Sequence, residues 1–261
     1  MELRKDYILD RWVIISKTRA MRPHQFKQDE SIYANDKGPK ECFFCPKNED
    51  KTPGEIGRIS EGRGWRMRWF PNKFPAVRLQ GKYDITTDNK FFTYSDAYGE
   101  HQIIVETQEH DKQMTDFDEE KLVEVLKTYA NRIEDMRARP HVKYVTVFKN
   151  HGKAAGTSII HSHSQLISLN IIPLEVQTKV DAVKRLGGCP YCEIINTEKN
   201  SHRRVFENDN MVAFTPYASR FNMEVWVFPK NHHKRLDDFT DEDYLDMARC
   251  LKHILAKLKT L

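Results

Sequence analysis

The spacing of apolar residues predicts two helices, each preceded by a short strand. One apolar stripe recurs every three or four positions and consists of Leu122, Val125, Leu126, Tyr129, Ile133 and Met136. A second stripe consists of Tyr244, Ala248, Leu251, Leu255 and Leu258. This period puts the apolar side chains on one helix face, so both stripes are interpreted as core-facing. The runs QIIVE (102–106) and EVWVF (224–228), which precede them, are typical of strands.

These elements belong to an internal repeat. Segment 109–133 aligns with segment 231–255, and in both a histidine at the second position is followed seven residues later by a phenylalanine. A Cys-x-x-Cys pair precedes each copy. The chain therefore contains two related halves.

The first half continues beyond its helix. Two further strand-like runs, 143–148 and 159–169, flank the loop KNHGKAAGTS. The second half has no counterpart, because the sequence stops at Leu261 directly after its helix. We expect an α+β fold of two motifs, with antiparallel sheets and packed helices and with the second motif incomplete. The expected domains are 1–173 and 174–261.

Composition and charge narrow the class of protein. The chain has 261 residues, 39% of them hydrophobic, which is enough for a packed core. Its net charge of +4 is not gathered into basic blocks, so no nucleic-acid partner is expected. The sequence has no signal peptide and no long apolar span, which predicts a cytosolic protein without a membrane partner. The Gly-, Arg- and Glu-rich stretch 52–64 is expected to be a surface loop.

Five cysteines form two Cys-x-x-Cys pairs plus Cys250, a residue of the second apolar stripe that is interpreted as a small core side chain. In a reducing compartment this spacing favours metal binding over disulfides. Cys42 and Cys45 have the spacing of a zinc knuckle, and His110 with His161 could complete a tetrahedral set. The alternative is a redox dithiol, which is disfavoured because Cys42 opens no obvious helix after a strand. A closed set of four ligands would be structural.

The second pair predicts a less complete site. Cys189, Cys192 and His232 supply three recognisable ligands. The fourth could be His202, His233, a group of a partner chain or water. A vestigial pair inherited with the repeat is the alternative.

A polar face on the strand-like run 159–169 indicates a site. Strand alternation puts His161, His163 and Gln165 on one face, with Ser162 and Ser164 on the other. Burying such groups without partners costs about 1–3 kcal/mol each, so their grouping needs a functional reason. We therefore predict that this face carries the chemistry.

Four segments, in this order, resemble the galactose-1-phosphate uridylyltransferase family of the histidine-triad superfamily. They are DRWVIISKTRAMRP, CFFCP, FPNKFPAV and KNHGKAAGTSIIHSHSQ, and the resemblance covers nearly the whole chain. It implies two histidine-triad motifs, a homodimer, and zinc on the first four ligands. It also implies that His163 is the nucleophile and that Gln165 holds a phosphoryl oxygen. The positions that would line the nucleotide and phosphates are Arg19, Arg22, Asn72, Asn150, Gly156, Thr157 and Ser158.

The resemblance implies nucleotidyl transfer. A nucleoside monophosphate, most simply UMP, would move between a nucleoside diphosphate sugar and a hexose 1-phosphate through a covalent nucleotidyl-histidine. The attacking imidazole must be neutral, so its other nitrogen should donate to a carbonyl. Histidine-triad hydrolases carry a third histidine where this chain has Gln165. Because an amide cannot shuttle a proton, transfer is favoured over hydrolysis.

Two departures from the family pattern keep alternatives open. Ser162 stands where typical members have proline and is similar to the plant ADP-glucose phosphorylase type. This favours, as an alternative, a nucleoside diphosphate sugar or dinucleoside polyphosphate phosphorylase. The family's second half also continues into another histidine-bearing strand, whereas this sequence ends at Leu261. A shortened branch, a truncated chain or a complementing partner would each account for that end. An alternative of another class is a non-catalytic, zinc-stabilised nucleotide-binding protein.

Overall fold

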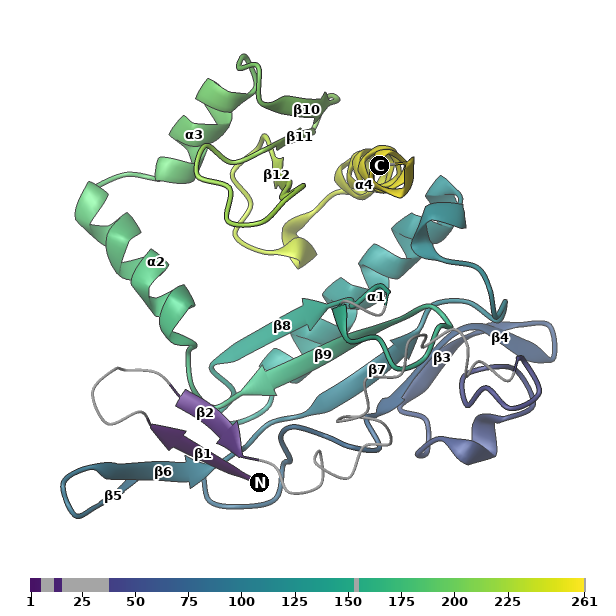
Figure 1. The fold of residues 1–261 in the computed structure, drawn as a ribbon, viewed down its shortest axis with the longest axis vertical. Helices are drawn as coiled ribbons and strands as arrows, with labels where there is room; N and C mark the ends of the chain where they lie inside the picture. Colours follow the sequence, from purple (N-terminus) through teal and green to yellow (C-terminus); the bar gives the residue numbers. More distant parts are fainter. Residues whose placement is uncertain (6–11, 16–37, 153–154, 261) are drawn as a thin grey trace. The chain divides into compact units, whose positions relative to one another are not determined.

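A computed structural model describes residues 1–5, 12–15, 38–152 and 155–260 (Figure 1). These residues form the predicted mixed α+β fold, with four α-helices and three sheets. Every strand pairing within the sheets is antiparallel. No helix among the described residues is long and apolar enough to cross a membrane.

The chain divides into two compact units. The first comprises Met1–Lys112 and Ile133–Gln177, and the second comprises Gln113–Arg132 and Thr178–Leu261. The second unit therefore includes the start of the first long helix in addition to the C-terminal part. The domain limits inferred from the repeat stay a prediction.

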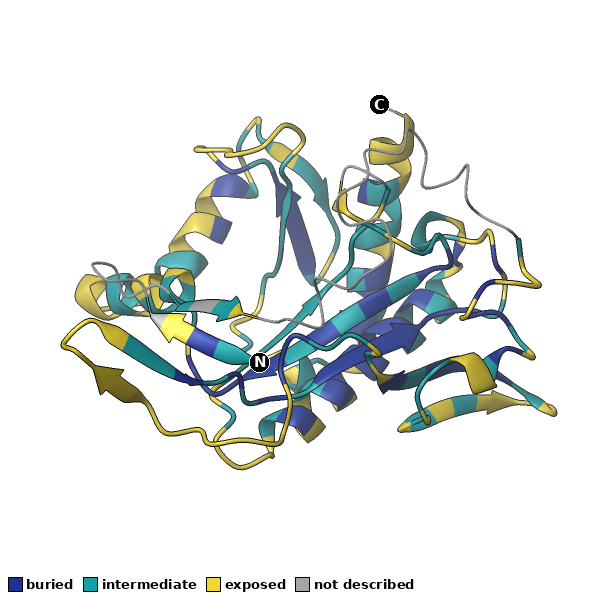
Figure 2. Cartoon of the chain, turned by 60° about the horizontal axis from the view of Figure 1, so that its bottom comes forward, coloured by how far each residue is buried: buried dark blue, intermediate teal, exposed yellow. Residues whose placement is uncertain are grey.

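A five-stranded sheet dominates the first unit. Its strands, in spatial order, are β3 (Gly57–Glu61), β4 (Gly64–Pro71), β7 (His101–Val105), β9 (His163–Leu169) and β8 (Tyr144–Phe148). All five residues of β7 are buried, and the middle of this sheet is largely dark blue in Figure 2. The sheet therefore places β9 between two strands that can supply side chains to either of its faces.

The surface loop expected over 52–64 is wrong for its second part, which forms the edge strand β3. This strand pairs with β4 through a hairpin in which Gly62 has a φ of 54°, a conformation that glycine adopts without steric cost. Most β3 side chains are exposed or half-buried. An edge strand of this kind has few apolar residues, so its sequence resembles a loop.

The strand that carries His163 begins later than its apolar run predicts. In its register Val105 is paired with His163, and Phe148 with Gln165. The Glu106 N–H donates to the Ser162 carbonyl at 3.2 Å, which extends the pairing by one residue. His161 therefore lies just outside the strand, where its side chain can turn toward the cysteines.

A four-stranded sheet packs at one end of the first unit. Its order is β2 (Trp12–Ile15), β1 (Glu2–Lys5), β6 (Phe92–Asp96) and β5 (Thr86–Asp88). A core of Leu3, Ala76, Val77, Ala97, Leu169 and Ile171 joins this sheet to the end of β9. Gly99 has a φ of 152°, and a Cβ there would overlap the Ser168 carbonyl oxygen. Glycine is thus required where the chain enters β7 beside β9.

Both predicted helices are present, as α1 (Glu119–Arg137) and α4 (Asp241–Thr260). Each follows a one-turn 3-10 helix, Met114–Asp116 or Leu236–Asp238. The Asp116 carboxylate accepts the Gln113 N–H at 3.0 Å, and the Asp238 carboxylate accepts the Arg235 N–H at 3.0 Å. The repeat thus reproduces the local structure of the helix entry as well as the apolar period.

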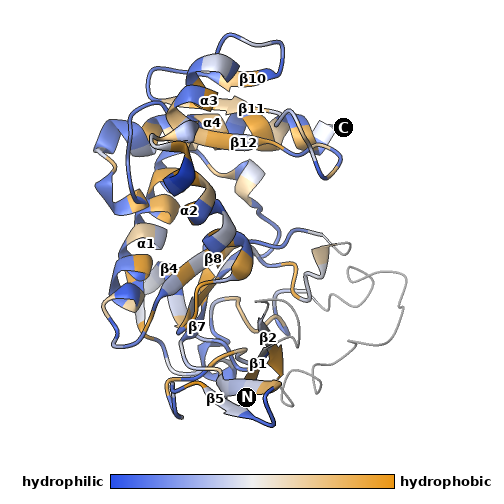
Figure 3. Ribbon diagram, turned by 90° about the vertical axis from the view of Figure 1, so that its left-hand side faces the viewer, coloured by the Kyte–Doolittle hydropathy of each residue, from blue (hydrophilic) through white to orange (hydrophobic). Residues whose placement is uncertain are grey.

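The second unit contains a three-stranded sheet of β10 (Arg204–Glu207), β11 (Met211–Phe214) and β12 (Trp226–Pro229). Two further helices are α2 (Leu174–Leu186) and α3 (Pro190–Glu198). β11 is completely buried, and β11 and β12 stand out as apolar in Figure 3. Cys250 lies in a core cluster with Met211, Ala213 and Ile254, as expected for a small core residue.

Candidate active site and metal clusters

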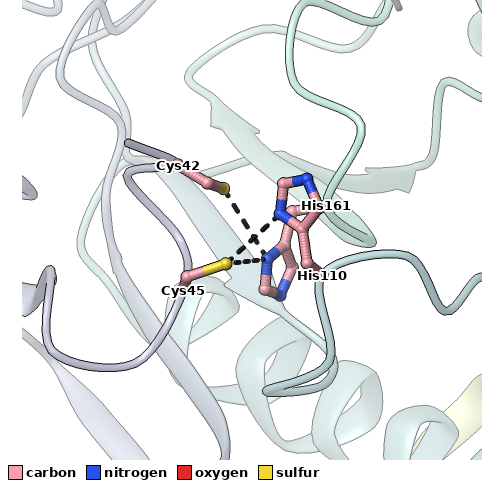
Figure 4. A group of neighbouring side chains, drawn as sticks. All are labelled: Cys42, Cys45, His110 and His161. Carbon is pink, nitrogen blue, oxygen red and sulfur yellow. Dashed lines mark hydrogen bonds between the residues drawn. The ribbon is translucent and has the colours of Figure 1, made fainter. Parts of the chain in front are cut away.

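The four residues predicted as zinc ligands come together in the first unit (Figure 4). The Cys45 sulfur lies 3.2 Å from Nδ1 of His110 and 3.4 Å from Nδ1 of His161. The Cys42 sulfur lies 3.7 Å from the same nitrogen of His161. All four ligand atoms lie within 4.8 Å of one another, and all four residues are buried.

This geometry fits a tetrahedral metal ion. Metal–sulfur and metal–nitrogen bonds of about 2.3 and 2.0 Å place neighbouring ligand atoms about 3.3–3.8 Å apart. Nε2 of His161 lies 2.7 Å from the Thr107 carbonyl, to which it donates, so Nδ1 keeps its lone pair for the cluster. Burial is the main reason that the pKa of His161 falls to about 4, which keeps the ring neutral. The residues therefore form a closed set of two sulfur and two nitrogen donors.

A buried arginine supports the knuckle loop, the loop that carries Cys42 and Cys45. Arg68 of β4 has no exposed side-chain surface, and its Nη2 donates to the Phe43 carbonyl at 3.2 Å. Its guanidinium lies 5.2 Å from the Trp65 ring centroid and 4.8 Å from that of Phe70. The Asn48 amide donates to the Cys42 carbonyl at 2.8 Å. Two carbonyls of the knuckle are thus fixed by side chains that sequence reasoning missed.

His163, the first residue of β9, has the tautomer that nucleophilic attack requires. Its Nδ1 lies 2.9 Å from the His161 carbonyl oxygen. Because a carbonyl only accepts, Nδ1 carries the proton and Nε2 presents a lone pair. Burial lowers the pKa of His163, and the Lys149 charge lowers it further, which outweighs the bond to the carbonyl. The edge of the Phe44 ring packs at 5.1 Å between centroids. A neutral imidazole held in this way can attack phosphorus.

Gln165 is oriented by His101, which sequence reasoning also missed. The Ala76 N–H donates to Nδ1 of His101 at 3.0 Å, so Nε2 of His101 carries the proton. That nitrogen lies 3.1 Å from Oε1 of Gln165 and donates to it. The Asn72 amide nitrogen lies 3.1 Å from the same nitrogen, while Asn72 Oδ1 accepts the Phe74 N–H. The Gln165 NH₂ group is therefore the end of the amide available to an oxygen ligand.

The other predicted substrate positions lie in the loop between β8 and β9, which contains Asn150, Gly156, Thr157 and Ser158. The Thr157 hydroxyl donates to the Asn150 carbonyl at 2.6 Å, and the Thr157 N–H donates to the Gly152 carbonyl at 3.3 Å. These bonds shape the loop from within, so the Thr157 hydroxyl proton is already used. Arg19 and Arg22 lie outside the described residues.

A buried ion pair lies on the opposite face of β9. Lys149 Nζ is 2.6 Å from Glu106, and the Ser162 and Ser164 hydroxyls donate to the same carboxylate at 2.6 and 2.5 Å. Burial alone would raise the pKa of Glu106, but Lys149 and the two serines lower it to about 2. The two serines face away from the histidines, as strand alternation predicts. Their charged partners, Glu106 and Lys149, were missed in the sequence. Glu106 ends one apolar run and Lys149 directly follows another, so each resembles an ordinary strand terminus.

The second cluster is smaller and more open. Cys189, Cys192 and His232 place their ligand atoms within 4.8 Å of one another, and the Cys192 sulfur lies 3.1 Å from Nδ1 of His232. The cysteines are half-buried and the histidine is exposed. Among the described residues neither His202 nor His233 joins this group. His233 instead directs Nε2 toward Asp243, at 3.4 Å from a carboxylate oxygen.

Comparison with known proteins decides the family. The family model for galactose-1-phosphate uridyl transferase, N-terminal domain, matches residues 1–173. The chain belongs to the galactose-1-phosphate uridylyltransferase family. The relationship predicted from the four motifs is thereby confirmed, and so is the prediction of an enzyme of the nucleotidyltransferase type.

Similar proteins within this family include both enzyme types considered above. ADP-glucose phosphorylase of Arabidopsis thaliana is 31% identical over 98% of this chain and 74% of its own length. Galactose-1-phosphate uridylyltransferase of Thermotoga maritima is 25% identical over 100% of this chain and 76% of its own. A solved uridylyltransferase structure superposes with a TM-score of 0.75 at 29% identity, covering 97% of this chain and 73% of that one. The Arabidopsis phosphorylase with bound ADP-glucose superposes at 0.72 and 28%, covering 99% and 77%.

Proposed function

We propose that this protein transfers a nucleoside monophosphate from a nucleoside diphosphate sugar to a hexose 1-phosphate through His163. Nε2 of His163 attacks the α-phosphorus, a P–N bond forms, and the P–O bond to the sugar 1-phosphate breaks. An oxygen of the acceptor phosphate then attacks the same phosphorus, the P–N bond breaks, and the neutral imidazole is regenerated. The observation that carries this proposal is the 2.9 Å bond from Nδ1 of His163 to the His161 carbonyl, which leaves Nε2 unprotonated.

The neighbouring groups have supporting roles in this proposal. The Gln165 NH₂ group, oriented by His101, donates to a phosphoryl oxygen as negative charge develops. Backbone amides of Gly156 and Ser158 do the same from the loop, and Thr157 shapes this loop through its bonds to the Asn150 and Gly152 carbonyls. Arg19 and Arg22 bind phosphates, and Asn72 and Asn150 adjoin the nucleotide. UMP is the favoured nucleotide, and the homodimer and the cytosolic location stay predictions.

Zinc is the metal that we assign to the four-ligand cluster. Two thiolates and two imidazoles in tetrahedral array suit zinc, and a site closed by four protein ligands is structural. When bound, the ion would connect the knuckle loop and the segment after β7 to the residue two positions before His163. The three-ligand cluster of Cys189, Cys192 and His232 is a second, more exposed candidate site.

A phosphorylase that uses the same histidine is the second candidate function. Two observations favour it: the relative at 31% identity is named ADP-glucose phosphorylase, and Ser162 replaces the proline typical of the transferases. In that case inorganic phosphate, rather than a hexose 1-phosphate, takes the nucleotidyl group. Both candidates share the covalent intermediate and differ in the acceptor.

Intact-protein mass spectrometry tests the proposal. The protein is mixed briefly with UDP-, ADP- and GDP-sugars, together with a His163→Ala variant and a His202→Ala control at an exposed histidine. We expect a nucleoside monophosphate adduct on the wild type and the control, and none on His163→Ala. Adding hexose 1-phosphate or inorganic phosphate to the adduct then identifies the acceptor. Nucleotide binding without any adduct would instead support the non-catalytic binding protein.

A further inference from the structure

We propose that the Glu106–Lys149 ion pair is a positioning device for the nucleophile, which fixes the main chain of residues 162–164 from the face opposite the His163 ring. The inference rests on the proposed function of His163. It concerns two residues that do not face the substrate side of β9. Their contribution to the reaction is therefore through the geometry of the histidine.

The order of the sheet brings the two charges together. Glu106 directly follows β7 and Lys149 directly follows β8, while β9 runs between these two strands (Figure 1). From the strands on either side, the two side chains extend toward each other across the start of β9, on the face opposite the His163 ring. The pair therefore spans three strands at the point where His163 enters the sheet.

Lys149 uses all three of its N–H donors at this point. Nζ donates to Glu106 at 2.6 Å, to the Ser162 hydroxyl at 2.9 Å and to the His163 carbonyl oxygen at 3.1 Å. The Glu106 carboxylate in turn accepts the hydroxyl protons of Ser162 and Ser164 at 2.6 and 2.5 Å. Three consecutive residues, with His163 in the middle, are thus bonded to a single charge pair.

These bonds determine where the imidazole can lie. Because the side chains of Ser162 and Ser164 are held on one face, strand alternation directs His163 to the other. The bond from Nδ1 to the His161 carbonyl spans only two residues, so it depends on the same stretch of main chain. A shift of that stretch would move Nε2 and weaken the preference for the reactive tautomer.

Stabilisation of the fold alone is a weak explanation for burying an ion pair at this position. Apolar residues of similar volume often replace a buried ion pair at little cost, or with a gain. Glu106 is completely buried, and Lys149 is only 18% exposed. Lys149 has no donor left for a phosphate, because its three hydrogens are used on the far face of the strand. Positioning, rather than contact with the substrate, is the role that this geometry allows.

The test compares Lys149→Met, Lys149→Arg and Glu106→Gln with the wild type. Lys230→Met is the matched control, since Lys230 forms a 2.7 Å pair with Glu207 in the other compact unit. One readout is the first-order rate of adduct formation in a single turnover with a saturating nucleotide sugar. The other is the ¹⁵N spectrum of labelled histidine at constant pH, which reports the His163 tautomer without any reaction.

We expect Lys149→Met to slow adduct formation by about 10²-fold, the usual effect of misplacing a reacting group by about 1 Å. Metal content and nucleotide affinity should stay close to those of the wild type, and the His163 signals should shift toward mixed tautomers. Glu106→Gln keeps the shape of the side chain, so it tests the same idea if Lys149→Met does not fold. Lys149→Arg should recover part of the rate, and Lys230→Met should leave rate and spectrum unchanged.

A wild-type rate together with a wild-type tautomer in Lys149→Met and Glu106→Gln would overturn the positioning role. Failure of the proposed function looks different, because the wild type itself would then form no adduct. In that case the ¹⁵N spectra still decide whether the ion pair fixes the His163 ring. Equal losses in Lys149→Met and Lys230→Met would also overturn the inference, since they would indicate a general effect on stability.

Discussion

The two cysteine clusters share one sequence pattern but differ in the number and the burial of their ligands. Each half supplies a Cys-x-x-Cys pair and a histidine seven residues before a phenylalanine. The first cluster gains a fourth ligand, His161, and is buried throughout, whereas the second has, within the described part of the chain, three ligands and an exposed histidine. The fourth ligand comes from the segment that also carries His163. The comparison teaches that the residues shared by the two repeats supply three ligands, and that in the first half the segment leading into β9 supplies the fourth and closes the site.

Removing one ligand from the closed cluster should have the largest effect on this contrast. In Cys45→Ser a sulfur that contacts both histidines is lost from a buried site. We expect loss of tightly bound metal, and destabilisation by about 3–5 kcal/mol as an uncompensated polar group is left buried. Thermal unfolding should shift by about 10 °C. Metal analysis after dialysis measures the metal content, and calorimetry measures the change in unfolding. Unchanged metal content would contradict a closed site.

Arg68→Met should weaken metal binding at the first cluster although it replaces none of the ligands. The substitution removes the donor to the Phe43 carbonyl and leaves Glu55, 18% exposed, without the guanidinium. Supporting residues of this kind typically change metal affinity by about 10–100-fold. Competition with a chromogenic chelator measures the affinity. Arg66→Met, at an exposed position of the same strand, is the control and should behave like the wild type.

Acid should destabilise the first unit through Glu106. Its pKa is lowered from 4.5 to about 2 in the folded protein, so its stabilising effect is complete above pH 4.5 and fades as the pH falls toward 2. Glu106→Gln should be less stable than the wild type at neutral pH, and the difference should shrink below pH 4.5. Urea unfolding at several pH values measures it, with Glu61→Gln as an exposed control. A difference independent of pH would rule out this linkage.

Cys192→Ser should have the smallest effect. The residue is half-buried and its histidine partner is exposed, so water can replace the lost contact. We expect less than about 1 kcal/mol of destabilisation and the loss of weakly held metal only. A loss of stability equal to that of Cys45→Ser would mean that the second cluster is closed as well.

The helices and the ligand set were accessible from sequence because local spacing encodes them. The 3.6-residue period predicts α1 and α4, and the Cys-x-x-Cys and histidine spacing predicts both clusters. Arg68 was not accessible. Its guanidinium is buried by Trp65, Phe70 and the knuckle loop, and the local sequence pattern does not show that these groups meet.

Glu106, Lys149 and His101 were missed for a related reason. Their roles depend on which strands lie on either side of β9, and that order is a long-range property of the sheet. An acidic residue at the end of an apolar run is a signal that could have indicated Glu106. The sequence spacing of Glu106 and Lys149 does not indicate that the two side chains are in contact.

The long separation of the ligands also has a consequence for synthesis on the ribosome. Cys42 and His161 are 119 residues apart in the chain. Until His161 leaves the exit tunnel, this cluster consists of Cys42, Cys45 and His110 alone, the same ligand types that the structure describes for the second cluster. Joining ends this distant costs on the order of 4 kcal/mol in chain entropy, which metal binding must offset. Retention of the ion would therefore mark the moment when the strand carrying His163 is in place.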